Sequence, residues 1–74
     1  MLKNDIGINA GTIWQMLSEK GSLSIKEIEE MTGYNDSMML FALGWLAKEN
    51  KIYFLHRKGS LYIELSNALS ENFY

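Results

Sequence analysis

Cysteine is absent from these 74 residues, and histidine occurs once, at position 56. The lack of cysteine excludes disulfides and thiolate metal ligands, and His56 alone cannot form a zinc site. We therefore expect no metal and no other cofactor. A core of this size rarely gives more than about 3–5 kcal/mol of net stability, so small chains often depend on disulfides, a metal or a partner subunit. Of these aids, self-association is the one that remains for this chain.

Basic residues are also few. Seven Lys and Arg against nine Asp and Glu give a net charge of −2 and a pI near 5.2. An independent nucleic-acid binder usually has a basic face and a domain pI above about 9, so the composition opposes this class. The distribution of charge matters more than its sum, because a mildly acidic domain can still carry a local basic stripe.

Long apolar segments are missing too. Residues 1–7 lack the apolar stretch of a signal peptide, and the longest apolar run, residues 38–47, has about half the length of a membrane span. We expect a cytoplasmic protein with no membrane partner. With 47% hydrophobic residues, the chain can form one small domain, which we assign to residues 1–65. Residues 66–74 form a tail that is either weakly structured or docked on the body.

A first helix is expected to begin after a cap at Asn4 or Asp5 and to end at Lys20. Its apolar stripe consists of Ile6, Ala10, Ile13, Trp14 and Leu17. Gly7 and Gly11 lie one turn apart, and each costs about 1 kcal/mol relative to alanine inside a helix. Either another group approaches the backbone closely there, or a frayed first turn tolerates glycine.

A second helix begins at a capping box. Residues 24–27, Ser-Ile-Lys-Glu, match the pattern in which the serine hydroxyl accepts from the amide three residues later and the glutamate bonds back to the cap amide. Its apolar side consists of Ile25, Ile28 and Met31. Gly33 is the expected left-handed terminator. Residues 22–23 can add a short extended segment before this helix, with Leu23 pointing inward.

A third helix is expected from about Asp36 to Glu49, capped by Asn35 or Asp36. Two helices joined by a short turn that contains glycine are typical of a helix-turn-helix. At 100° per residue, the side chains of the third helix separate into two arcs. The inward arc consists of Met39, Ala42, Leu43 and Leu46. The outer arc, which faces the major groove in a DNA-binding helix-turn-helix, consists of Met38, Phe41 and Trp45, with Lys48 at its edge.

A β-hairpin follows the third helix. Residues 52–55, Ile-Tyr-Phe-Leu, are typical of a strand, and residues 57–60 supply the turn. Residues 61–65 then alternate, with Leu61, Ile63 and Leu65 inward. Three helices followed by a hairpin predict an α+β fold, a winged helix-turn-helix with a three-helix core and a C-terminal β-hairpin wing.

The residues of three stretches resemble a known family. Residues 6–14, 23–28 and 42–52 together are similar to small stand-alone winged helix-turn-helix proteins of bacteria and archaea whose function is unknown. The most specific part is Ala-Leu-Gly-Trp-Leu-Ala at positions 42–47. The resemblance extends over residues 6–65 and implies a winged-helix fold in a regulatory setting. It implies no catalytic or ligand-binding residues.

The outer arc of the third helix is the first candidate site. Met38, Phe41, Gly44 and Trp45 are proposed as a protein interface, because large exposed apolar patches mark interaction surfaces and Trp, Phe and Met are enriched there. Gly44 would permit close backbone approach. The alternatives are that Leu69 and Phe73 of the tail cover this arc within one chain, or that it stays in solvent.

Basic residues around the wing are the second candidate site. They are Lys48, Lys51, His56, Arg57 and Lys58, which could contact phosphates or a minor groove. Hairpin tips are also often basic for solubility alone. Glu27, Glu29 and Glu30 of the second helix would repel a DNA backbone, although such residues are more commonly a solvated helix face.

Catalysis has no candidate residues, since no nucleophile, acid or phosphate-binding loop lies at a recognisable spacing from His56. The leading hypothesis is a non-catalytic winged-helix interaction module that forms a homodimer through the outer arc of the third helix. The alternative is a DNA-binding transcriptional regulator that contacts DNA through the wing tip. A third reading has the domain bind another protein within a larger regulatory assembly.

Overall fold

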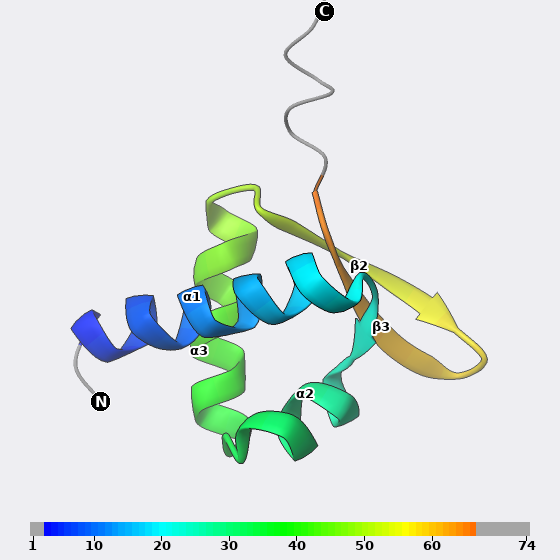
Figure 1. The fold of residues 1–74 in the computed structure, drawn as a ribbon, viewed down its shortest axis with the longest axis horizontal. Helices are drawn as coiled ribbons and strands as arrows, with labels where there is room; N and C mark the ends of the chain where they lie inside the picture. Colours follow the sequence, from blue (N-terminus) through cyan, green and yellow to red (C-terminus); the bar gives the residue numbers. More distant parts are fainter. Residues whose placement is uncertain (1–2, 67–74) are drawn as a thin grey trace, which may run out of the picture.

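A computed structural model describes residues 3–66 of the chain. Three helices and three strands follow one another in the order α1, β1, α2, α3, β2, β3 (Figure 1). Their bounds are Lys3–Lys20 for α1, Leu23–Ser24 for β1, Ile25–Thr32 for α2, Asp36–Lys48 for α3, Ile52–Arg57 for β2 and Ser60–Leu65 for β3. The arrangement confirms the predicted α+β winged helix-turn-helix.

The sheet is antiparallel with strand order β1-β3-β2. The wing, which is the β2–β3 hairpin, extends away from the helices (Figure 1). Its turn has two residues, Lys58 and Gly59, with φ angles of 50° and 79°. Positive φ at both positions suits the twist of a hairpin, and glycine adopts it without strain. The short strand before α2, β1, pairs with β3 of the wing, and Leu23 lies opposite Ile63.

The core lies where α1 crosses α3 and where one face of the sheet closes against the helices. Its buried side chains are Ala10, Ile13, Leu17, Leu23, Ile28, Met39, Ala42, Leu43, Leu46, Ile52 and Ile63. All four residues predicted for the inward arc of α3 are among them, so that prediction is confirmed. All three strands contribute, since Leu23, Ile52 and Ile63 close the core from the sheet side.

Local hydrogen bonds fix the ends of the helices. The Ser24 hydroxyl accepts from the Glu27 amide at 3.0 Å, and the Glu27 carboxylate accepts from the Ser24 amide at 2.8 Å, so the predicted capping box is formed. Gly33 ends α2 in the left-handed conformation, with φ of 77°. The Asn35 side chain accepts from the Met38 amide at 2.9 Å and caps α3.

Several details differ from the sequence-based expectations. Helix α1 begins at Lys3, so Asn4 and Asp5 lie inside its first turn and do not cap it. Trp14 and Met31 are exposed, because both lie at the edge of their helix's apolar arc and the core contacts only its centre. Strand β2 continues to Arg57, two residues beyond the predicted strand, because pairing persists up to the two-residue turn.

The predicted tail lies almost entirely outside the described residues, which end at Ser66. The same holds for the suggested contacts of Leu69 and Phe73. Between residues 3 and 66, no helix combines the length and apolar character needed to cross a membrane.

Candidate interaction surface on the third helix

Phe41 and Trp45 lie on the outside of the domain, on the side of α3 predicted for them. Their exposed fractions are 54% and 36%, while Met38 is half-buried and Gly44 is exposed. The helix places them there because four of its apolar residues already fill the inward arc. Since the residues between Asp36 and Lys48 are largely apolar, the remaining large side chains must face outward.

Leu40 is a member of this surface that the sequence analysis missed. With an exposed fraction of 69%, it is the most exposed large apolar side chain in the part of the chain that the structure describes. Its angle on the helical wheel could have identified it, because position 40 lies about 60° beyond the edge residue of the inward arc, Leu43. We define the outer face of α3 as Met38, Leu40, Phe41, Gly44 and Trp45.

The outer face lacks the side chains that read DNA bases. Arg, Lys, Asn and Gln make most specific base contacts, and α3 contains one lysine, Lys48, and none of the other three. Its first turn is acidic at Asp36. This carboxylate interacts with Glu29 of α2, and their hydrogen bond raises the pKa of Glu29 above its usual value. The helix-turn-helix side of the domain is therefore apolar and acidic.

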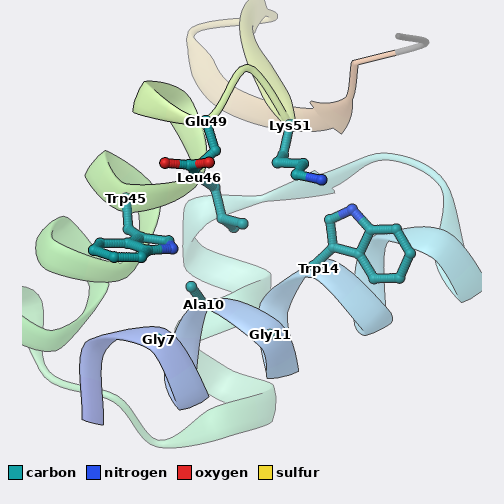
Figure 2. Close-up of a pocket in the computed structure, with 8 residues that line it drawn as sticks. All are labelled: Gly7, Ala10, Gly11, Trp14, Trp45, Leu46, Glu49 and Lys51. Atoms are coloured by element: carbon teal, nitrogen blue, oxygen red, sulfur yellow. The ribbon is translucent and has the colours of Figure 1, made fainter. Parts of the chain in front are cut away.

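A second apolar feature lies beside the outer face, between α1 and α3. A groove with a cavity volume of about 420 Å³ lies between the indoles of Trp14 and Trp45 (Figure 2). We call it the tryptophan groove; its lining residues are Gly7, Ala10, Gly11, Trp14, Trp45, Leu46, Glu49 and Lys51. A neighbouring hollow, lined by Lys3, Asn4, Gly7 and Trp45, adjoins it toward the start of α1.

The end of α3 sets the polar rim of this groove. The Lys51 amide donates to the Leu46 carbonyl at 2.9 Å, and the Asn50 amide donates to the Ala47 carbonyl at 3.0 Å. With Asn50 in the left-handed conformation at φ of 58°, this is a Schellman motif. It ends the helix and directs the chain into β2, so that Glu49 and Lys51 lie at the groove edge (Figure 2).

Gly7 and Gly11 lie on the α1 side of the tryptophan groove. They belong to the regular part of α1, so a frayed first turn does not explain them. A Cβ atom at either position would meet no atom within 4 Å, so no described residue needs the space. The predicted close approach is therefore not made by residues 3–66.

Two hydrogen bonds occupy the carboxylate of Glu64 on the wing. Arg57 Nη2 lies 2.7 Å from Glu64 Oε2, and the Tyr53 hydroxyl donates to Glu64 Oε1 at 2.7 Å. The hydrogen bond from Tyr53, with the charge of Arg57, lowers the pKa of Glu64, and the same bond raises the pKa of Tyr53. The Arg57 guanidinium also lies over the Tyr62 ring, 5.7 Å from its centroid. Arg57 thus already has an anionic partner within its own sheet.

The predicted basic residues do not form one cluster. His56, Arg57 and Lys58 lie at the wing tip, whereas Lys51 borders the tryptophan groove and Lys48 ends α3. Lys51 and Lys58 are seven positions apart along an extended chain, which is about 23 Å. In residues 3–66 no three His, Asp or Glu side chains gather in a way that could hold a metal ion.

Comparison with known proteins places these features in a family. A family model described as a winged helix-turn-helix domain (DUF2582) matches residues 1–65. The chain is 43% identical over 53 residues to the uncharacterized protein MJ1608 of Methanocaldococcus jannaschii, a match that spans 68% of this chain and 74% of that protein. It is also similar to the solution NMR structure of protein BT2368 from Bacteroides thetaiotaomicron. That match has a TM-score of 0.82 and 31% identity over 100% of this chain and 90% of the other.

Proposed function

The chain belongs to the DUF2582 family of winged helix-turn-helix domains, and from this premise we propose that it is a non-catalytic interaction module. In this proposal, two copies form a homodimer through the outer face of α3. The observation that carries it is the exposure of Leu40, Phe41 and Trp45 on the helix that a DNA-binding relative would place in the major groove.

A second copy is the partner that this surface fits best. A two-fold contact needs only one self-complementary patch, and the outer face is apolar on both sides of Gly44. Leu40 and Gly44 are four residues apart, as are Phe41 and Trp45, so Gly44 lies among the large side chains. A Cβ at Gly44 would meet no described atom within 4 Å, which leaves room for a second helix to approach its backbone.

The oligomeric state tests this proposal. Sedimentation equilibrium over a hundredfold concentration range should give a dimer for the natural chain and a monomer for Phe41→Glu, because a charged group would lose its hydration in an apolar interface. Ile8→Glu is a matched control, since Ile8 is an exposed apolar residue of α1 outside the outer face. It should leave the dimer intact. A natural chain that is monomeric at every concentration would contradict the proposal.

A DNA-binding function through the wing is the second candidate. His56 and Lys58 are exposed at the tip, and a dimer would present two such tips at a fixed spacing. Fluorescence polarisation with a random DNA duplex at low salt tests it. Binding should weaken as salt rises. Lys58→Ala should lower the magnitude of the slope of log K against log salt by about 1, whereas the control Lys26→Ala on α2 should leave the slope unchanged. Absence of binding at low salt would exclude this function.

A further inference from the structure

The tryptophan groove is an apolar concavity beside α3 that residues 3–66 leave unfilled. Trp14 has an exposed fraction of 42%, and Trp45 is exposed across from it. Leu46 and Ala10 extend the apolar lining between the two indoles (Figure 2). We propose that residues 67–74 of the same chain dock in the tryptophan groove, with Leu69 and Phe73 packing between Trp14 and Trp45.

The described chain ends at the edge of this groove. The amide of Ser66 donates to the carbonyl of Lys51 at 2.8 Å, and Lys51 is one of the groove-lining residues. The last described residue, Ser66, is therefore hydrogen-bonded to a residue of the groove lining. Eight residues can extend over about 26 Å, whereas Gly7 and Trp14 are separated by about 10 Å along α1. The segment is long enough to cross the groove without moving any described element.

The chemistry of the segment matches that of the groove. Its sequence is Asn-Ala-Leu-Ser-Glu-Asn-Phe-Tyr, with Leu69 and Phe73 four positions apart and one charged residue, Glu71.

Tethering favours the chain's own segment over that of a second copy. A segment joined directly to Ser66 has an effective concentration in the millimolar range, which exceeds that of separate copies in dilute solution. A segment docked in the groove also explains why glycine occurs at positions 7 and 11, because larger side chains there would narrow the groove on its α1 side. The matched family domain ends at residue 65, so this docking would be an addition to that domain.

Paramagnetic relaxation can test the docking in the full chain. The protein has no cysteine, so Asn72→Cys gives a single site for a nitroxide label. In the labelled chain, the amide signals of Gly7 and Gly11 and the indole N–H signals of Trp14 and Trp45 should broaden strongly. The amide of Gly59 at the wing tip is the internal reference and should not broaden. Leu69→Asp with Phe73→Asp in the same labelled chain should restore the lost signals.

Two outcomes would overturn the proposal. One is the absence of broadening at Gly7 and Gly11. The other comes from a mixture of two chains, one that carries the isotope but no nitroxide and one that carries the nitroxide but no isotope. If the signals of Gly7 and Gly11 broaden in this mixture as strongly as in the doubly labelled chain, the segment docks in a neighbouring copy. The same measurement in a labelled chain that also carries Phe41→Glu distinguishes docking within one chain from an effect of the proposed homodimer. Broadening that persists there supports docking within one chain, even if the outer face of α3 proves to have no partner.

Discussion

Glu64 joins the side chains of Tyr53 and Arg57 on the wing. Its carboxylate accepts from Tyr53 and pairs with Arg57, which also lies over Tyr62. The sequence predicts Arg57 as a phosphate contact, and its sequence position gives no sign of this partner. The pairing depends on the strand register, in which Tyr53 lies opposite Glu64, and this register follows from a two-residue turn at Lys58 and Gly59. A local sequence window does not contain that information.

Tyr53→Phe tests the cause of the lowered pKa of Glu64. Removal of the phenol hydroxyl deletes the hydrogen bond that contributes most to the shift, so the pKa of Glu64 should move up toward the ordinary glutamate value. A carbon-13 NMR titration of the side-chain carboxyls would measure it. The ring of Tyr53 is exposed, so the fold should be unaffected. An unchanged titration midpoint would mean that the hydrogen bond does not set this pKa.

Glu64→Gln gives the corresponding stability prediction. Because folding lowers the pKa of Glu64, its ionised form stabilises the native state above the usual glutamate pKa of about 4.3, and this contribution is lost as pH falls through the folded-state pKa. The natural chain should therefore exceed Glu64→Gln in urea midpoint at pH 7, and the difference should shrink on acidification. A difference that stays constant from pH 7 to pH 3 would contradict this linkage.

At the scale of elements, α2 is the part most fully specified by local sequence. Its start follows from Ser24 and Glu27, and its end from Gly33; both signals act within four residues. Helix α3 is less fully specified by local sequence, because it is apolar on almost every side. Its inward arc was predicted correctly from angular spacing, but the outward position of Leu40 was missed. An apolar run fixes which residues can be buried, whereas the neighbouring elements determine how many of them are.

Ser24→Ala should measure the contribution of the capping box. The change removes the acceptor for the Glu27 amide, which should lower the free energy of unfolding by about 1 kcal/mol. Urea denaturation at pH 7 would detect this loss. Ser37→Ala is the matched control, because Ser37 is exposed within the first turn of α3, where alanine is the better helix former. Equal losses in both variants would show that the effect does not come from the cap.

At the scale of the whole molecule, several large apolar side chains remain exposed because the small core does not bury them. Leu40, Phe41 and Trp45 on one side of α3 and Trp14 across the tryptophan groove are all exposed within residues 3–66. In the two proposals, a second copy covers the outer face and residues 67–74 fill the groove, and Trp45 contacts both because it lies on the border of the two surfaces. The sequence alone predicted the exposed aromatic arc of α3. The groove could not be predicted from it, because it depends on how α1 crosses α3.

Dimerisation through the outer face would make thermal stability depend on protein concentration. Each tenfold increase in concentration favours the native dimer by about 1.4 kcal/mol, shared between two chains. For chains of this length, that corresponds to a rise in Tm of about 3–6 °C per tenfold increase. Scanning calorimetry of the natural chain should show this rise, whereas Phe41→Glu should unfold at a lower Tm that is independent of concentration. Ile8→Glu should retain the concentration dependence, because its new charge lies away from the outer face. A natural chain whose Tm is constant across two decades of concentration would show that folding and self-association are not coupled, and the exposed face of α3 would then have no stabilising role in a homodimer.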